Sequence, residues 1–195
     1  YCTLPLHAST QMTIYNASGL AQIKALGFTR CIPARELSLS EIKQLCDMQL
    51  MEIEVFVHGA LCMSYSGQCL FSFFLGGRSG NKGNCAQPCR LPYTIYMGDR
   101  VASFSAKPAY HLSPQDLCTL PFLDRLIATG VRSLKIEGRL KGPEYVAIVT
   151  RKYRDAIDKI RAGEVPFYTT KDLDDLALSF CRTGFTSGHM LGKMP

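Results

Sequence analysis

The chain has 195 residues, with 22 Lys plus Arg against 16 Asp plus Glu, which gives a formal net charge of +6, and 47% of its residues are hydrophobic. This balance excludes a disordered tail, a collagen-like repeat and a highly charged coiled coil. No window approaches the roughly 18 consecutive apolar residues of a membrane span. The composition therefore predicts a mildly basic globular chain whose length suits one domain.

The first part of the chain alternates between predicted strands and helices. Residues 4–14 are predicted to form a strand, and residues 17–26 a helix that stops before a glycine. Residues 28–33 form a second, short strand. Ser38 begins the next helix, because a glutamate three residues later completes a capping box, and residues 51–57 form the following strand.

The middle of the chain is less regular. Extended segments are predicted at residues 94–97 and 103–110, around a turn at Gly98. Ser113 is predicted as the N-cap of a new helix, because the proline after it suits the first helical position.

Helix 121–129, strand 131–136 and helix 143–161 then restore the alternation. Strands joined by crossover helices through short links indicate an α/β fold with a parallel sheet. A closed (β/α) barrel of the TIM type needs about 250 residues, and only four strands are convincing here. We therefore expect an incomplete TIM-barrel-like fold, the second half of the barrel. An open doubly wound sheet is the alternative, although no Gly-rich phosphate loop follows a strand.

The start of the chain at Tyr1, inside a predicted strand and without an initiator Met, supports an incomplete barrel. Residues 1–165 are expected to form the C-terminal half of the barrel, including a Gly- and Cys-rich insertion at residues 59–110. Residues 166–195 are expected to form a linker and the start of a C-terminal domain. The missing N-terminal half of the barrel would then belong to the full-length protein.

Strand 51–57 and the residue after it carry polar groups on one face. Alternation places Glu52, Glu54, Phe56 and His58 opposite the apolar residues of the strand. In a barrel this face points inward, and active sites lie at the carboxyl ends of the strands. The alternative is a solvated edge strand with its charges in water.

The segment 133–139 ends a strand in a similar way. Lys135 and Glu137 share one face, and the following glycine allows a tight turn that folds Arg139 back. A structural ion pair would also explain this group. Two strands that each deliver a glutamate to one rim nevertheless favour a pocket for acid–base chemistry or substrate orientation. The catalytic candidates are therefore Glu54, His58, Glu137 and Arg139.

The nine cysteines are an odd number, and no secretory signal precedes them. A disulfide framework is therefore disfavoured, and a reducing, cytoplasmic compartment is expected. Four scattered cysteines are predicted to be small buried hydrophobes: Cys2, Cys31, Cys46 and Cys181.

Four other cysteines fall within one stretch rich in Gly, Ser and Asn: Cys62, Cys69, Cys85 and Cys89. Glycines let a chain wrap around a metal cluster and leave N–H groups free to bond sulfur. Four thiolates suit zinc or an iron–sulfur cluster. Intervals of six and fifteen residues favour the larger cluster, because zinc ligands usually come in close pairs. Cys118 is a fifth candidate, and a nucleophilic cysteine is less favoured, because no thiol has an obvious His partner in the sequence.

Basic residues form two groups. Residues 78–107 contain five Lys or Arg against one acid, and residues 124–161 contain ten against five. Most of the second group is expected on the solvent face of the last helix. Together with Tyr93, Tyr96 and Tyr110, these residues would give a positive rim for a phosphate backbone and for base stacking.

The segment 54–72, which reads EVFVHGALCMSYSGQCLFS, resembles the signature of peptidase family U32, the collagenase-like proteases. Further blocks resemble that family in the same order: residues 7–11, 34–38, 83–90, 113–117 and 133–139. The similarity covers nearly the whole chain. Near residue 185, GFTSG resembles the start of the family's C-terminal domain, although the preceding CRTG departs from the more common Asn-Arg-Gly run.

This resemblance implies either a peptidase or an iron–sulfur enzyme that hydroxylates bases of tRNA or rRNA without molecular oxygen, in some members with prephenate. It implies RNA as the partner and a 4Fe-4S cluster with Cys62, Cys69 and Cys85 as ligands. Cys89 is expected to be the fourth ligand because of its spacing from Cys85, and Cys118 is the alternative fourth ligand. Residues of the matching blocks are expected to bind substrate: Gln11, Arg35, Glu36 and Lys135. The residues favour the hydroxylase, because no metalloprotease helix motif, serine elbow or aspartic pair is present. A zinc-stabilised RNA-binding module is the non-enzymatic alternative.

Overall fold

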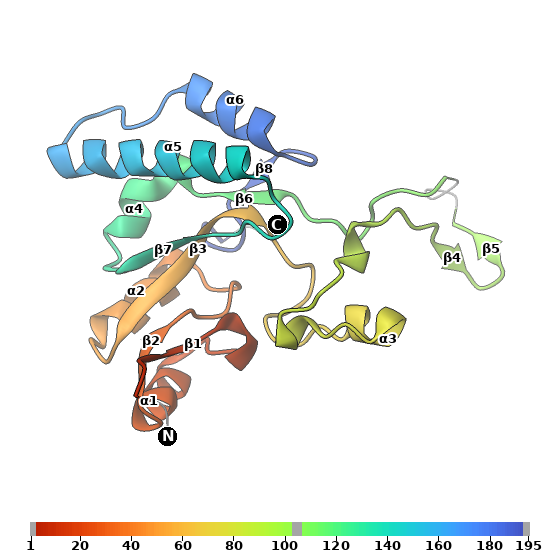
Figure 1. Ribbon diagram of the computed structural model, residues 1–195, viewed down its shortest axis with the longest axis horizontal. Coiled ribbons are helices and arrows are strands. Elements are labelled where there is room, and N and C mark those ends of the chain that lie inside the picture. The colour runs from red at the N-terminus through yellow and green to blue at the C-terminus, as the bar shows by residue number, and fades with distance from the viewer. Residues whose placement is uncertain (1–2, 103–106, 193–195) are drawn as a thin grey trace. The chain divides into compact units, whose positions relative to one another are not determined.

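The computed structural model describes residues 3–102 and 107–192. The chain divides into two compact units (Figure 1): unit 1 comprises residues 1–61 and 115–195, and unit 2 comprises residues 62–114. Of the extended segment predicted at 103–110, residues 103–106 lie outside the described residues.

Unit 1 contains a six-stranded mixed sheet. Its strands are β1 (Leu6–Ala8), β2 (Phe28–Cys31), β3 (Glu52–Ala60), β6 (Asp116–Cys118), β7 (Ser133–Ile136) and β8 (Phe185–Thr186). The central strand is β3, which pairs in parallel with β2 and β7, while β6 pairs antiparallel with its last residues. The α/β fold with a largely parallel sheet is therefore confirmed. The described residues do not close this sheet into a barrel.

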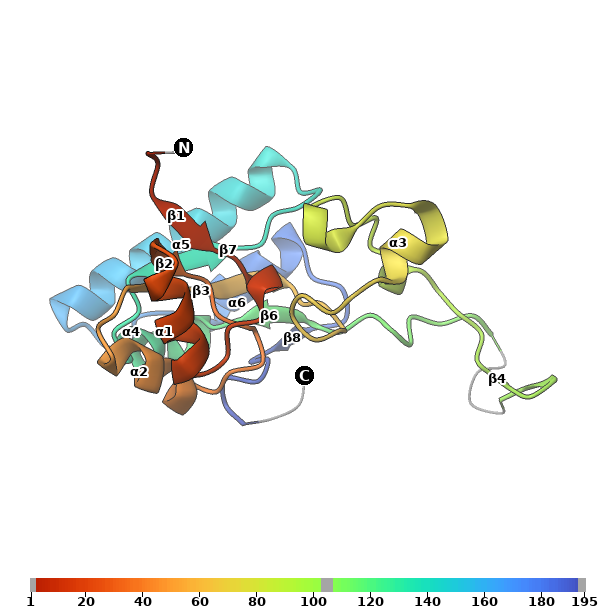
Figure 2. The same ribbon diagram turned by 90° about the horizontal axis from the view of Figure 1, so that it is seen from below.

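The helices of unit 1 pack against this sheet around one core. They are α1 (Ala17–Ala25), α2 (Leu39–Asp47), α4 (Leu123–Ile127), α5 (Pro143–Ala162) and α6 (Thr170–Ser179). Their apolar stripes meet the alternate residues Ile53, Val55 and Val57 of β3, which are all buried. Figures 1 and 2 show α5 running along the sheet. Each large apolar side chain buried in this way stabilises the fold by about 1.5–3 kcal/mol.

Local capping signals explain where two helices begin. At the start of α2, the Glu41 N–H donates to Ser38 Oγ (3.4 Å), and the Ser38 N–H donates to the Glu41 carboxylate (2.8 Å). This is the capping box predicted from the sequence. Thr169 and Asp172 form a second capping box at α6, which was not predicted. Within the range 166–195, the structure thus has α6 and β8.

The helix predicted to begin at Ser113 is wrong, because residues 116–118 form β6. Asp116 is buried, and its Oδ1 accepts a hydrogen bond from Arg182 Nη1 at 2.6 Å. The Ser113 hydroxyl accepts a hydrogen bond from Arg90 (2.7 Å). Pairing of β6 with β3 and β8 therefore overrides the local helix signal. Helical structure resumes with a 3-10 turn at residues 120–122 and then α4.

The first predicted strand, 4–14, is much shorter in the structure. Only residues 6–8 pair as β1, and a 3-10 turn follows at Thr10–Met12. Thr13 then adopts the left-handed conformation with φ of 54°, which turns the chain away from the sheet.

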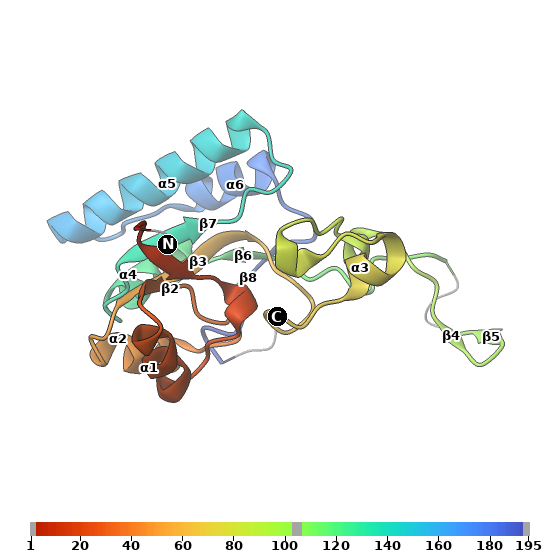
Figure 3. The same cartoon turned by 60° about the horizontal axis from the view of Figure 1, so that its bottom comes forward.

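Unit 2 is built from one short helix, one hairpin and turns. The helix is α3 (Phe71–Gly76), and the hairpin pairs β4 (Tyr96–Met97) with β5 (Arg100–Val101) around the predicted turn at Gly98. Figure 3 shows α3 and the hairpin as separate parts of this unit. Two 3-10 turns, Gly80–Lys82 and Pro88–Arg90, lie between them in the sequence.

Gly59 in β3 occupies a position where the backbone requires glycine. Its φ is +104°, and an added Cβ would lie 2.5 Å from the Glu137 carbonyl oxygen and 2.9 Å from the Tyr145 hydroxyl. Gly59→Ala is expected to lower the free energy of unfolding by about 3 kcal/mol, through strain and displaced neighbours. Gly27→Ala is the matched control, because Gly27 has a φ of +89° and open space around the added Cβ. This substitution is expected to lower the free energy of unfolding by about 1 kcal/mol. Equal losses in urea unfolding would contradict this account.

Candidate functional site

Most predicted site residues of unit 1 lie at the carboxyl ends of its parallel strands. Gln11 follows β1, and Arg35 and Glu36 follow β2. His58 lies near the end of β3, and Glu137 directly follows β7. Ligands of parallel α/β sheets bind at this edge. The fold therefore brings these residues to the edge where a substrate site is expected.

A pocket of about 240 Å³, counting its open mouth, lies at this edge. Its lining includes a guanidinium from Arg35, an imidazole from His58 and a carboxylate from Glu137. A larger pocket of about 370 Å³ shares Arg35 and is bounded on one side by residues 187–190. One small cavity is thus lined by residues that follow or end three strands: Arg35, His58 and Glu137.

The imidazole of His58 is almost completely buried, with 1% of the residue exposed. Its ring lies 5.5–6.0 Å, between centroids, from the rings of Tyr145, Tyr153 and Phe185. Burial lowers the pKa of His58 to about 4, because a charged imidazolium would lose its hydration. His58 is therefore neutral near pH 7.

The hydrogen bonds of Tyr153 favour one tautomer of His58. The Tyr153 hydroxyl donates to the Val57 carbonyl oxygen (2.7 Å) and accepts from the Thr119 N–H (3.1 Å). Its oxygen lies 3.4 Å from His58 Nδ1. Because the hydroxyl proton is already used, we assign the proton of the imidazole to Nδ1. Nε2 then carries a lone pair, and it has no hydrogen-bond partner among the described residues.

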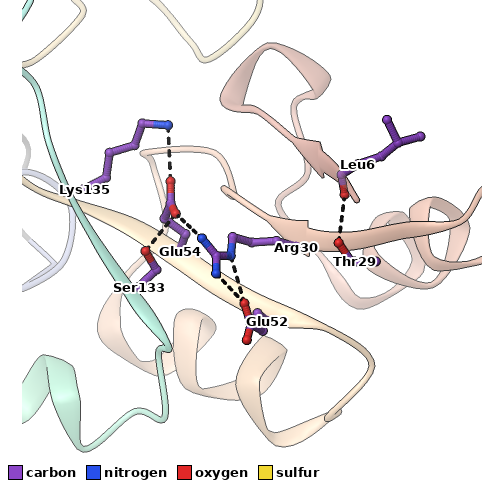
Figure 4. Close-up of polar contacts among 7 residues, drawn as sticks. All are labelled: Leu6, Thr29, Arg30, Glu52, Glu54, Ser133 and Lys135. Carbon is purple, nitrogen blue, oxygen red and sulfur yellow. Dashed lines mark hydrogen bonds and ion pairs between the residues drawn. The ribbon is translucent and has the colours of Figure 1, made fainter. Parts of the chain in front are cut away.

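Glu54 is the centre of a polar network that joins β2, β3 and β7 (Figure 4). Its carboxylate accepts hydrogen bonds from Ser133 Oγ (2.8 Å) and Arg30 Nη1 (3.1 Å), and it lies 3.2 Å from Lys135 Nζ. Burial alone would raise the pKa of Glu54. Hydrogen bonds from Ser133 and Lys135, together with the charges of Lys135 and Arg30, outweigh this effect and lower the pKa. Glu54 therefore stays ionised, which suits a positioning role better than proton transfer.

The structure separates His58 from this network. A β-bulge between Phe56 and His58, in the pairing of β3 with β7, interrupts the predicted alternation. Within the part of the chain that the structure describes, the recorded contacts of the His58 ring are aromatic, and none joins it to Glu54. The prediction that these two side chains share one polar face is therefore not met.

Glu54→Gln is expected to lower the free energy of unfolding by about 1–2 kcal/mol, because Lys135 and Arg30 lose a half-buried carboxylate partner. Glu52→Gln is the matched control, since Glu52 also pairs with Arg30 but its side chain is 52% exposed, against 11% for Glu54. About 0.5 kcal/mol or less is expected for this control. Chemical denaturation of both variants at neutral pH measures the difference. An equal effect of the two substitutions would show that Glu54 is an ordinary surface charge.

The tight turn predicted after Glu137 is present. Glu137 Oε1 accepts the N–H of Arg139 at 2.6 Å, and the Tyr145 hydroxyl donates to the Glu137 carbonyl oxygen at 2.9 Å. Lys135, predicted beside Glu137, instead lies against Glu54 and the ring of Phe56. Four residues of the Glu54 network and of the surroundings of His58 and Glu137 were not predicted as site residues from the sequence: Arg30, Ser133, Tyr145 and Tyr153. Their roles depend on which strands and helices become neighbours.

In unit 2, local hydrogen bonds support the segment that carries Cys85. The N–H of Ala86 donates to the buried Ser72 Oγ of α3 (2.8 Å). The N–H of Gln87 donates to Cys85 Sγ (3.3 Å). The four thiols predicted as ligands are free and half-buried.

The thiol of Cys89 lies close enough to the thiols of Cys62, Cys69 and Cys85 for their charges to affect its pKa. Burial raises the pKa of Cys89, the charge of Arg90 lowers it, and the thiols of Cys62, Cys85 and Cys69 raise it. Among residues 3–102 and 107–192, no group of three or more His, Cys, Asp or Glu is placed to hold a single metal ion. The thiols are thus neighbours without forming a tight single-ion site.

Cys118 has a different environment. It lies in the core of unit 1, 3.8 Å from the Tyr153 hydroxyl, and burial raises its pKa to about 11. Cys31 is buried as predicted, whereas Cys46 and Cys181 are half-buried, and Cys2 lies outside the described residues.

Within the described part of the chain, no helix combines the length and the apolar character needed to cross a membrane.

Comparison with known proteins places this chain in a protein family. The family model of peptidase family U32 matches residues 1–195, and the chain belongs to this family. The expectation drawn from the sequence is therefore confirmed. No solved structure matches the chain.

Relatives in this family carry two kinds of names. The chain is 44% identical over 158 residues to 23S rRNA 5-hydroxycytidine C2501 synthase of Escherichia coli, covering 80% of this chain and 24% of the relative. It is 37% identical to tRNA hydroxylation protein P1 of Bacillus subtilis, covering 94% of this chain and 45% of the relative. It is 34% identical to Collagenase of Porphyromonas gingivalis, covering 96% and 48%. The chain thus spans less than half the length of each.

Proposed function

We propose that this chain is part of an iron–sulfur-dependent enzyme that hydroxylates a base of tRNA or rRNA without molecular oxygen. The observation that carries the proposal is the presence of four free, half-buried thiols within residues 62–89 of unit 2. These thiols occur in a chain whose relatives include an rRNA 5-hydroxycytidine synthase and tRNA hydroxylation proteins.

The donor set fits a 4Fe-4S cluster better than one zinc ion. Zinc ligands usually come in close pairs, whereas intervals of six and fifteen residues separate Cys62, Cys69 and Cys85. An N–H donor to Cys85 Sγ and half-buried thiols are typical of cluster surroundings. Cys62, Cys69, Cys85 and Cys89 would hold the cluster, which supplies a redox-active, Lewis-acidic iron for the hydroxyl donor.

The pocket of unit 1 would bind the small reactants. Arg35 offers a charge for an anionic donor such as prephenate, and Glu137 can orient a polar group. The Nε2 atom of His58 can accept a proton from a bound molecule. The cavity is smaller than the usual range of about 300–1,000 Å³, so it suits a single base or a small carboxylate. Gln11, Glu36, Lys135 and Arg139 would complete substrate binding at the same sheet edge.

We further propose that the sheet is half of a (β/α) barrel. The helices of unit 1 pack their apolar faces onto one side of the sheet in a single core. The other side carries the network of Arg30, Glu52, Glu54 and Lys135. An open doubly wound sheet would place helices on both sides, whereas a barrel keeps them outside and polar residues within.

A peptidase is the second candidate, because relatives named Collagenase align with most of this chain. One thiol–imidazole pair, Cys118 and His58, occupies directly paired positions of β6 and β3. Burial raises the pKa of this thiol to about 11 and lowers the pKa of this imidazole to about 4. An activated cysteine nucleophile needs the opposite shifts. The described geometry thus favours the hydroxylase.

Nucleoside mass spectrometry tests the proposed reaction. RNA from cells lacking the full-length gene should have lost one hydroxylated nucleoside, which returns when the gene is restored. Anaerobically purified protein should be brown and contain iron and acid-labile sulfide. Colourless protein with one zinc per chain would favour the RNA-binding module. Gelatin hydrolysis that persists after every metal is removed would favour the peptidase.

A further inference from the structure

Unit 2 exposes large aromatic side chains. The exposed fractions are 73% for Tyr65, 76% for Phe74, 62% for Tyr96 and 60% for Tyr110. Phe73, next to Phe74 on α3, is also exposed, and the two rings meet edge to face with centroids 5.9 Å apart. Exposed apolar groups that gather in one region mark interaction sites. This unit is therefore a candidate docking surface.

The same unit carries most of the net positive charge of the chain. Residues 62–114 contain five Lys or Arg and one acid, a net charge of +4. The other 142 residues contain 17 basic and 15 acidic side chains, which contribute only +2. Four basic side chains of unit 2 are exposed: Arg78, Lys82, Arg100 and Lys107. Such a surface attracts a polyanion.

Exposed aromatic and exposed basic residues follow one another at short intervals in the sequence of this unit. Arg78 follows Phe74 by four residues, and Lys107 precedes Tyr110 by three. On the hairpin, Tyr96 pairs with Val101 and Met97 pairs with Arg100, so the exposed side chains of Tyr96 and Arg100 extend from opposite faces of the two strands. The hairpin and α3 are separated along the unit (Figure 3). The arrangement is thus a track of several positions and not one pocket.

We propose that unit 2 binds single-stranded RNA, with its exposed aromatic rings stacking on unpaired bases and its exposed cations contacting phosphates. The choice of RNA rests on the proposed function, and the assignment of this surface goes beyond it. Every base offers a π-face for stacking, and cations beside aromatic rings follow the backbone. A second protein chain would suit exposed apolar groups alone, but the charge of +4 favours a polyanionic partner. Paired bases hide their faces, so a duplex fits this surface poorly.

Fluorescence anisotropy tests the proposal. The intact chain is titrated against a labelled single-stranded RNA of about 12 nucleotides and against a duplex of the same sequence. The single strand should bind more tightly. Phe74→Ala, Tyr96→Ala and Tyr110→Ala should each weaken binding by about 5- to 150-fold, the range for loss of one stacked base. Tyr15→Ala is the matched control, because Tyr15 is equally exposed (59%) but lies in unit 1, and affinity should not change.

Salt dependence provides an independent readout of phosphate contact. Arg100→Gln should reduce the slope of log affinity against log salt by about 0.7, the value for one phosphate contact on a single strand. Arg151→Gln, an exposed charge on α5 of unit 1, should leave the slope unchanged.

Three results would overturn the proposal. The first is equal affinity for the single strand and the duplex, and the second is an equal effect of Tyr15→Ala and of the unit 2 variants on RNA binding. The third is loss of self-association in Phe74→Ala with unchanged RNA binding. The last result would assign the surface to a second copy of the chain. The binding assay requires neither turnover nor a cluster. If these variants weaken RNA binding while cellular RNA keeps all its hydroxyls, the surface stands and the hydroxylase proposal fails. If the variants leave RNA binding unchanged while cellular RNA loses a hydroxylated nucleoside in the absence of the gene, the RNA-binding surface is refuted and the hydroxylase proposal stands.

Discussion

Cys89→Ser is expected to abolish the visible absorbance of the anaerobically reconstituted protein, whereas Cys118→Ser is expected to preserve it. Cys89 lies among the thiols of Cys62, Cys69 and Cys85, which affect its pKa. Cys118 instead lies in the core of unit 1 beside the Tyr153 hydroxyl. All four proposed ligands belong to unit 2, so the site lies within one segment of the chain.

The measurement is iron and acid-labile sulfide per chain, together with absorbance, in both variants. Circular dichroism at matched temperature shows whether each variant is folded. Because the ligating thiols must lose their protons, iron loading should increase with pH. The reverse pattern, with Cys118→Ser colourless and Cys89→Ser brown, would refute the ligand assignment while leaving a cluster in place.

Strong local signals predicted the outer elements of the fold. The capping box at Ser38 and the long apolar stripe of residues 143–161 correspond closely to α2 and α5. Both signals depend on residues three or four apart, so the sequence contains all the contacts that decide them. The Thr169–Asp172 capping box before α6 is equally local, so this helix start was also predictable from the sequence.

Contacts between distant residues decided the elements that the sequence did not predict. Ser113 and Pro114 resemble a helix start, but Asp116 pairs with Arg182, 66 positions later. This pairing places residues 116–118 in the sheet. A local pattern cannot weigh a partner that far along the chain, and sheet formation overrides intrinsic helix preference.

The candidate site likewise combines features that local sequence predicts with features that depend on distant contacts. Sequence position relative to strand ends predicted that His58 and Glu137 meet at one edge, and the family resemblance added Arg35 as a substrate-binding residue. All three line one pocket. Strict alternation did not predict the bulge before His58, because it arises where β3 pairs with both β6 and β7. The aromatic surroundings of His58 come from α5 and β8, whose approach no local pattern indicates.

The stability of the protein is expected to fall by about 3 kcal/mol between pH 6.5 and pH 4 because of His58. Its pKa is about 4 in the folded chain, against 6.5 for an exposed histidine. Between these values the unfolded chain binds a proton that the folded chain excludes, so protonation favours unfolding. The contribution is fully present above pH 6.5 and is lost as the pH falls toward 4. The groups that contact or pair with His58 are Tyr145, Tyr153, Phe185 and Cys118, and the charged residues Arg35 and Glu137 line the same pocket. Burial is the effect that lowers the pKa of His58 in these surroundings.

Urea unfolding of the native chain and of His58→Phe, at intervals from pH 4 to pH 7.5, measures this contribution. The substituted ring keeps the aromatic packing against Tyr145 and Tyr153 but cannot bind a proton, so the steep fall below pH 6.5 should become shallower by about 3 kcal/mol over the range. His7→Gln is the control, because His7 is exposed, and it should retain the full fall. A His58→Phe profile parallel to that of the native chain would show that His58 is protonated in the folded state near its ordinary pKa. That outcome would refute burial as the cause of the neutral state of this imidazole.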